Sequence, residues 1–368
     1  MKKFSAYFFC LALLSCQKEE LMETMTLLPL QQGVNVMEQG AKADGVSDDS
    51  PAFEKAIRLA NSLKLPVVVP AGRYRADIRI GYDGIQIVGQ GQPSASFKYG
   101  SIILGSINCN NNKNIKIQHL GIDASNAQVA AALSSGDGED SVDLNHQYLN
   151  ISLQGGGYQK FNHGILCQTG RQIKIQKILV KNFYHGIALR SGAVTLDSIE
   201  AISCGFTSII IKSAEGKNAR TRDIVINNVK ISGDADNPYE RGGMILIQSF
   251  DNNSLTENIE INKISSRFAG VSSLSIDQSQ GTVRHIKIKD VNSSYQGHDS
   301  GTACFDINGG SDILLSNCSS YQARGTGFRC SGNAEKVRAE QCYESGSGVR
   351  PWWGNFSYLQ LNGQEIIK

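Results

Sequence analysis

The sequence has few prolines, few aromatic residues and no apolar run after its N-terminal segment that is long enough to span a membrane. Only 7 of the 368 residues are proline, whereas 38 are glycine, and this composition favours many turns between uninterrupted strands. The nine cysteines form no Cys-x-x-Cys pair and no cluster with histidine, so the sequence predicts no zinc site. Their spacing leaves open whether they are buried thiols or disulfides.

The N-terminal segment is predicted to be an export signal. Lys2 and Lys3 precede the apolar run from Phe4 to Leu14, and Leu13-Leu14-Ser15-Cys16 ends it. This ending resembles a bacterial lipobox, which implies cleavage after residue 15 and lipidation of Cys16; a plain secretory signal is the alternative. Residues 16–36 would then be a tether, and its acidic start resembles the surface-export signal of Bacteroidetes lipoproteins. We expect an outer-membrane lipoprotein at the cell surface.

The mature chain is predicted to be neutral overall. Removing residues 1–15 leaves 34 basic and 34 acidic side chains. Net charge therefore gives no support for a nucleic-acid partner. We expect a monomer that meets the membrane only through its lipid anchor.

A six-residue pattern, apolar at its first, third and sixth positions, recurs along most of the chain. From residue 173 onward its copies are separated by 21 to 35 residues, and a second short apolar strand precedes most of them. The copies begin at Ile115, Ile173, Val194, Ile224, Ile259, Ile286, Ile313 and Val337. A fixed core pattern with variable spacing is typical of a solenoid with loop insertions. The sequence therefore predicts an all-β fold, a single-stranded right-handed parallel β-helix.

The most specific motif is Gly40-Ala-Lys-Ala-Asp-Gly-Val-Ser-Asp-Asp-Ser50. An amphipathic run with Pro51 at its start follows, and Asp49 or Ser50 can cap a helix over about residues 50–62. Such a helix would cover the open end of the coil, so we interpret the acidic residues of the motif as structural.

This motif, together with Val67-Val-Val-Pro-Ala-Gly-Arg-Tyr74, resembles the N-terminal signature of the pectate-lyase superfamily. The resemblance implies a β-helix that binds an acidic polysaccharide in a groove along its outside. We assign residues 37–350 to the coil and residues 351–368 to a C-terminal cap, in which Trp352 and Trp353 either close the coil or stack on sugar.

Two neighbouring units carry a histidine at the same place. Phe161-Asn-His163-Gly-Ile is followed 22 residues later by Phe183-Tyr-His185-Gly-Ile. If the units stack, their backbones lie about 4.8 Å apart and the two imidazoles share one face. Matching this column to later units places Ser208, Arg241 and Ser300 in it.

The residues on this face fit β-elimination, in which a base removes the C5 proton of a uronic acid and the group at C4 leaves. The reaction needs a base, an acid and a cation against the carboxylate. We assign the base to His185 or His163, the acid to Tyr184, and the cations to Arg190, Lys212 and Arg241. Further substrate-binding residues are predicted on the same flank: Asn162, Gln168, Tyr239, Gln248, Asp277 and His298.

This arrangement is similar to that of uronate lyases of the same architecture. We therefore predict an endo-acting polysaccharide lyase for a hexuronate-containing glycan such as chondroitin, pectin or alginate.

Other functions stay open from the sequence. The polygalacturonase branch of the superfamily carries Asn-Thr-Asp, Asp-Asp, Gly-His-Gly and Arg-Ile-Lys motifs, and none is intact here. Asp277 and Asp306 are the best remaining carboxylate pair for a glycoside hydrolase. A third alternative is a non-catalytic surface glycan-binding protein. In that case the two histidines are turn residues bonded to loop carbonyls, and the cations keep the surface soluble.

No cofactor follows from the sequence, although Ca²⁺ is compatible with it. A polar, glycine-rich loop carries Asp137, Glu139, Asp140 and Asp143, whose oxygens could hold Ca²⁺. The spacing matches no EF-hand, and a solvated acidic loop is the alternative.

Overall fold

The computed structural model describes residues 32–93, 96–136, 145–157, 162–168, 170–213, 219–233, 244–249, 251–267, 272–278, 280–294 and 302–367. Predictions made for residues outside these ranges remain predictions. They concern Cys16, the acidic loop, Tyr239, Arg241, His298 and Ser300.

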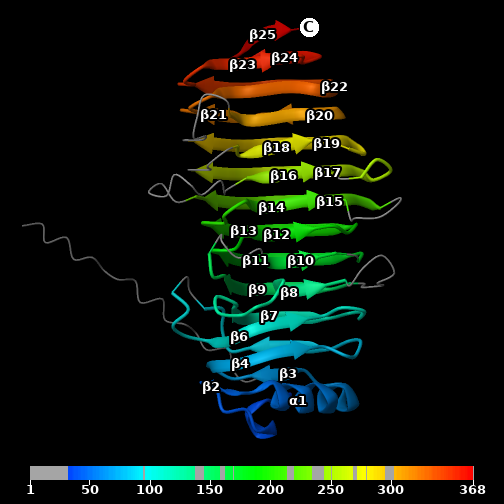
Figure 1. The fold of residues 1–368 in the computed structure, drawn as a ribbon, viewed down its shortest axis with the longest axis vertical. Coiled ribbons are helices and arrows are strands. Elements are labelled where there is room, and N and C mark those ends of the chain that lie inside the picture. Colours follow the sequence, from blue (N-terminus) through cyan, green and yellow to red (C-terminus); the bar gives the residue numbers. More distant parts are fainter. Residues whose placement is uncertain are drawn as a thin grey trace, which may run out of the picture.

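The chain forms the predicted right-handed parallel β-helix, whose turns stack along one axis (Figure 1). Parallel strands joined by crossovers have this hand almost without exception. Two ladders of strands run the length of the coil, and each turn adds one rung to both.

The first ladder, here named the short-strand ladder, carries the predicted site. Its members are β4 (Gly72–Arg79), β6 (Ser101–Asn108), β8 (Ala131–Ser135), β10 (His163–Cys167), β12 (His185–Leu189), β14 (Thr207–Lys212), β16 (Ile245–Gln248), β18 (Leu274–Asp277), the start of β20 (Ala303–Ser316), the start of β22 (Thr326–Ser345) and β23 (Arg350–Gly354). Ile165, Ile187 and Ile209 pair in register and are fully buried. Burying each such side chain contributes about 1.5–3 kcal/mol, so register and burial reinforce each other.

The second ladder consists mainly of longer strands. Its members are β1 (Val34–Asn35), β3 (Val67–Val69), β5 (Gln86–Gly89), β7 (Lys116–Asp123), β9 (Gln147–Gln154), β11 (Ile173–Lys181), β13 (Val194–Ile202), β15 (Arg220–Ser232), β17 (Leu255–Arg267), β19 (Thr282–Ser294), β21 (Ser319–Tyr321), β24 (Tyr358–Leu361) and the later parts of β20 and β22. Several strands turn a corner at one residue with left-handed φ, for example Lys177 (55°), Ser198 (57°) and Asn228 (54°). The corner lets one strand contribute to two faces of the coil.

The N-terminal end is closed by α1 (Ser50–Leu63), as the motif predicts (Figure 1). Phe53 is buried and its ring contacts Tyr74 of β4 edge-on, with centroids 5.6 Å apart. The expected side-chain cap is wrong, because Asp49 occupies the cap position without capping. Its carboxylate instead accepts the backbone N–H groups of Lys42 and Ala43, which fixes the segment before the helix.

The rest of the N-terminal motif is also structural. Between η1 (Met37–Gln39) and α1 lies β2 (Asp44–Asp48), which pairs with β4. The Asp44 carboxylate accepts the N–H groups of Val46 and Ser47 and the Ser47 hydroxyl. These bonds, led by that from the Ser47 backbone, lower the pKa of Asp44 to about 2.

The C-terminal end is closed by an antiparallel pair, β24 with β25 (Gln364–Ile367). The two tryptophans differ in their packing. Trp352 pairs with Phe328 and packs against the core, whereas Trp353 is 42% exposed, with the Arg350 guanidinium 5.9 Å from its ring centre. Trp352 therefore closes the coil and Trp353 faces outward.

All seven cysteines in the described ranges are buried, and none of them forms a disulfide there. Cys318 and Cys342 lie on consecutive rungs of the core, where they act as small apolar side chains. Neither helix in the described ranges combines the length and apolar character that crossing a membrane requires.

Candidate functional site

His163 and His185 lie on one face of the coil, one rung apart. They pair directly in the parallel register of β10 and β12, and their rings stack with centroids 5.0 Å apart at 28°. Both side chains are partly exposed. The stacking follows from the repeat, because equivalent positions of consecutive units become vertical neighbours.

Each imidazole has one nitrogen engaged. His163 Nδ1 lies 3.1 Å from the Ala130 carbonyl oxygen, which can only accept, so Nδ1 carries the hydrogen. In the neutral ring Nε2 is then the acceptor. His185 Nδ1 lies 2.6 Å from the Thr207 hydroxyl oxygen. A hydrogen bond from His163 to a backbone carbonyl is also expected if the two histidines are turn residues without a catalytic role.

Electrostatics favour the neutral form of both rings. Burial lowers the pKa of His163 below its usual value, and the charges of Arg190 and Lys212 lower it further. The hydrogen bond with the Ala130 carbonyl raises this pKa and offsets part of the effect. Burial, the neighbouring His163 and the same two cations lower the pKa of His185 to about 3. Both histidines are therefore proton acceptors at neutral pH.

Tyr184 and Phe206 flank the second histidine. The Tyr184 ring meets His185 edge-on at 4.7 Å and stacks on Phe206 at 5.4 Å, and Phe206 also meets His185 edge-on. Tyr184 is partly exposed, which places it at the surface beside the imidazole rather than in the core. Thr207, not Ser208, continues the column, because β12 and β14 pair His185 with Thr207; the sequence-based placement of Ser208 is wrong.

Ser208 is buried instead and takes the position of Gly186 on the next rung. Thr207 was not predicted from the sequence, although the repeat indicates its position. Ile187 aligns with Ile209, and His185 lies two residues before Ile187, so its equivalent is Thr207, two residues before Ile209.

An apolar floor and a pair of cations complete this part of the face. Leu166, Ala188, Ile210 and Leu246 occupy one column of the short-strand ladder and belong to an apolar cluster separate from the core. Arg190 and Lys212 lie just beyond this floor, each one residue after the paired Leu189 and Ile211. Because both cations lower the pKa of both histidines, the four groups share one electrostatic environment.

Further along the coil the same columns become acidic. Gln248 pairs with Lys212 and then with Asp277, and its side-chain amide donates to Asp277 over 3.3 Å. On the next rung, Asp306 forms a two-point ion pair with Arg329, whose Nε lies 2.7 Å from Oδ1. Burial and the charge of Asp306 raise the pKa of Asp277. Arg329 was not predicted, because only the register reveals its pairing.

The other predicted residues divide between surface and interior. Gln168 is partly exposed. Cys167 pairs with Leu189, so the residues that follow them, Gln168 and Arg190, lie in the same column on neighbouring rungs. Asn162 is only 2% exposed, and neither polar atom of its side chain has a hydrogen-bond partner among the described residues. The structure thus buries Asn162 rather than presenting it at the surface.

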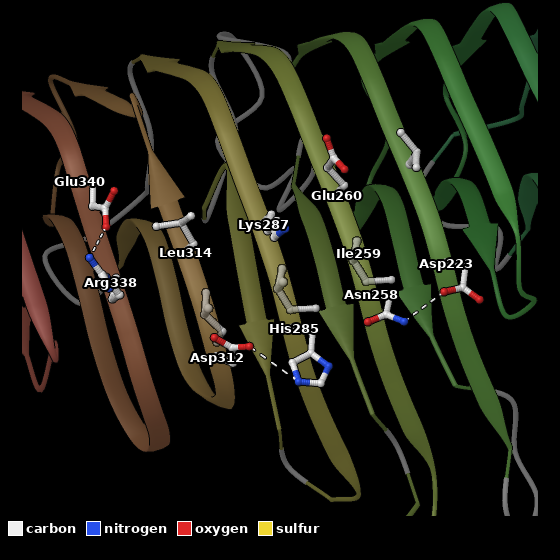
Figure 2. A pocket seen from close by; sticks show the side chains of 13 residues that line it. Asp223, Asn258, Ile259, Glu260, His285, Lys287, Asp312, Leu314, Arg338 and Glu340 are labelled. Carbon is white, nitrogen blue, oxygen red and sulfur yellow. Dashed lines mark hydrogen bonds and ion pairs between the residues drawn. The ribbon is translucent and has the colours of Figure 1, made fainter.

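A separate hollow of about 720 Å³ lies on the long-strand flank, across β15, β17, β19, β20 and β22 (Figure 2). Several of its polar and charged side chains pair with each other: Asn258 donates to Asp223, His285 lies 3.6 Å from Asp312, and Arg338 pairs with Glu340. Its lining includes four acids and two bases besides His285: Asp223, Glu260, Asp312, Glu340, Lys287 and Arg338. That excess of acid disfavours an anionic ligand there.

No group of three or more His, Cys, Asp or Glu side chains with metal-binding geometry occurs within the described ranges. The Ca²⁺ question concerns a loop outside them.

Comparison with known proteins identifies the architecture. The chain is similar over its length to the A-module of the Azotobacter vinelandii mannuronan C-5 epimerase AlgE6, with 14% identity, 89% of this chain and 98% of the other covered, and a TM-score of 0.56. It is also similar to a hyperthermoactive exopolygalacturonase from Thermotoga maritima, with 12% identity, 92% and 94% covered, and a TM-score of 0.51. At such identities the likeness concerns the fold. No curated protein matches in sequence.

A family described as "Rhamnogalacturonase A/epimerase, pectate lyase-like" matches residues 33–235, more than half of the chain. The match includes the N-terminal motif, the capping helix, both histidines and both cations of the site. The chain therefore belongs to this pectate lyase-like family.

Proposed function

We propose that the protein is a polysaccharide lyase that cleaves a hexuronate-containing acidic glycan by β-elimination on the short-strand ladder. One observation carries the proposal: two stacked imidazoles, both neutral at pH 7, share their electrostatic environment with Arg190 and Lys212. A base next to two cations is what removal of a proton beside a carboxylate requires. Membership of a pectate lyase-like family is consistent with an acidic polysaccharide as substrate.

In the proposed reaction the uronate carboxylate lies against Arg190 and Lys212. Their charges stabilise the negative charge that develops when the C5–H bond breaks. His185 takes the proton at Nε2 while Nδ1 donates to Thr207. The electron pair then forms the C4–C5 double bond, the C4–O bond breaks, and Tyr184 protonates the leaving oxygen. Transfer of a proton from the imidazolium to the tyrosinate, directly or through solvent, restores both groups.

The low pKa of His185 makes it a weak base in the free protein. A bound carboxylate opposes the two cations that help to lower that pKa, so binding of a uronate raises it. The base thus becomes stronger when the substrate is in place. His163, with its acceptor nitrogen defined by the Ala130 carbonyl, is the alternative base.

The test is incubation of the purified protein with uronate polysaccharides while ultraviolet absorbance of the unsaturated product is followed. His185→Asn should lower kcat by about 100-fold or more, the usual contribution of a positioned base. His285→Asn, a histidine exchange on the other flank, is the matched control and should retain the wild-type rate. A near-normal rate in His185→Asn would remove that residue from the mechanism and direct attention to His163.

Other outcomes would contradict the lyase itself. Deuterium incorporated from solvent at C5 without new absorbance would indicate epimerisation. Binding without any chemical change would indicate a glycan-binding protein.

A glycoside hydrolase is the second candidate, and one observation favours it. Asp277 has a raised pKa, whereas the neighbouring Asp306 is held in an ion pair with Arg329. Two carboxyl groups in such different environments can act as acid and base. New reducing ends without ultraviolet absorbance, lost in Asp277→Asn, would support this candidate over the lyase.

A further inference from the structure

The side chains of Tyr184 and His185 belong to one packed cluster of rings. Their centroids are 4.7 Å apart with the rings nearly perpendicular, and Phe206 contacts both of them. The Phe206 ring lies almost parallel to that of Tyr184, at 6°, and the 2.6 Å contact with Thr207 holds the imidazole. The two rings are therefore fixed against each other and do not stand on opposite walls of a cleft.

This contact decides from which side the two groups reach a sugar. A pyranose ring between a base and an acid needs a contact distance of about 3.5–4 Å on each of its faces, so the two groups would be about 7 Å or more apart. Rings with centroids 4.7 Å apart leave no such space between them. A sugar bound on this part of the coil meets both side chains from the solvent side, and therefore with one face of its ring.

The other groups of the site lie on the same side. His163, the alternative base, stacks on His185 from the preceding rung of the short-strand ladder. Arg190 and Lys212 lie at the carboxyl ends of β12 and β14 in the same ladder. Exchanging one histidine for the other as the base therefore leaves base, acid and cations on one side of the uronate.

Removal of the C5 proton and departure of the C4 oxygen on one face of the ring is a syn elimination. It requires a uronate whose C5 hydrogen and C4 oxygen lie on the same face. D-Glucuronate and D-mannuronate have this configuration. D-Galacturonate, L-guluronate and L-iduronate carry the two groups on opposite faces, so a base and an acid would have to reach them from opposite sides.

We propose that the site cleaves its glycan by syn elimination, at D-glucuronate or D-mannuronate, and leaves galacturonate, guluronate and iduronate intact. The inference rests on the proposed function for the roles of His185 and Tyr184. His185 removes the C5 proton, the electron pair of the C5–H bond forms the C4–C5 double bond, and the C4–O bond breaks as Tyr184 donates its proton to the leaving oxygen. Because the two side chains touch, the imidazolium returns a proton to the tyrosinate on the same side.

The test compares initial rates, followed by ultraviolet absorbance of the unsaturated product, on glycans that differ only in configuration at C5. One pair is unsulfated chondroitin, which contains glucuronate, and desulfated dermatan, which contains iduronate in its place. The other pair is polymannuronate and polyguluronate, and polygalacturonate is the fifth substrate. We expect the first member of at least one pair to be cleaved about 100-fold or more faster than its partner and than polygalacturonate, because a base on the wrong face loses its contribution.

Two variants test the position of the acid. Tyr184→Phe keeps the ring that stacks on Phe206 but removes the hydroxyl group, so kcat on the preferred glycan should fall about 100-fold or more in a protein that circular dichroism shows to be folded. Tyr343→Phe, at an exposed tyrosine of β22, is the matched control and should retain the wild-type rate.

The outcomes separate this inference from the proposed function. Equal rates within the pair that is cleaved, or faster cleavage of desulfated dermatan, polyguluronate or polygalacturonate, would overturn the inference while the lyase stands. A wild-type rate in Tyr184→Phe would place the acid elsewhere and would also overturn it. Unsaturated product from none of the five glycans would refute the lyase, and the inference with it.

Discussion

Gly186, directly after His185, is where the close stacking of rungs can be tested most directly. A Cβ built at this position would lie 2.5 Å from the Ser208 carbonyl oxygen and 3.1 Å from the Cys204 sulfur. The nearest of these atoms belongs to the backbone of β14, which cannot rotate away as a long side chain can. Gly186→Ala therefore has to move two paired strands apart by about half an ångström or more.

The expected cost is that of overpacking a well-packed site, about 1–3 kcal/mol. In a thermal unfolding experiment followed by circular dichroism this corresponds to a fall in the midpoint of roughly 1.5–4 °C for a chain of this length. The same displacement should reach the site, since the 2.6 Å contact of His185 with Thr207 joins the same two strands. We expect the folded variant to lose about tenfold in kcat, as reacting groups are sensitive to small displacements.

Gly81→Ala is the matched control, because a Cβ at Gly81 would meet nothing within 4 Å. It should leave the midpoint unchanged or slightly raised. Suppose that the unfolding midpoint of Gly186→Ala instead falls within about 1 °C of that of the control. In that case close approach of successive rungs is not the reason that glycine follows the histidines, and the reasoning is wrong.

The histidines and cations lead to two further predictions. Arg190→Gln removes a cation that lowers the pKa of both histidines, so both pKa values should rise in an NMR titration. Lys174→Gln, on another strand, is the control and should leave both values unchanged. If Arg190→Gln also leaves them unchanged, Arg190 does not act on the two imidazoles. The pKa values of the two histidines in the folded protein are below the unfolded value of about 6.5, so the unfolded chain binds more protons and stability should fall as pH drops from about 6.5 toward 3. Each fully coupled proton adds about 1.4 kcal/mol per pH unit, and the urea midpoint of His163→Asn/His185→Asn should fall less steeply over this range than that of the wild-type protein. Parallel pH profiles for the two proteins would show that these imidazoles do not titrate in this way.

The repeat itself determined the fold and the pairing of the histidines. Ile165 and Ile187 occupy equivalent positions of consecutive units, and stacking places such positions one above the other. The histidines two residues earlier had to become neighbours for the same reason. The sequence also placed Arg190 and Lys212 on one outward column, since alternation along a strand decides which residues face outward.

Only the tertiary structure decided the state and the partners of these groups. The neutral form of His185 depends on burial and on three charged or titratable neighbours, which no spacing along the chain reports. Asp306 and Arg329 are 23 residues apart and Gln248 and Asp277 are 29 apart, because loops of different length separate their strands. Asn162 resembles a surface residue in the sequence but is buried in the coil. A short repeat encodes which backbones pair, whereas burial and charge depend on every segment that packs around a side chain.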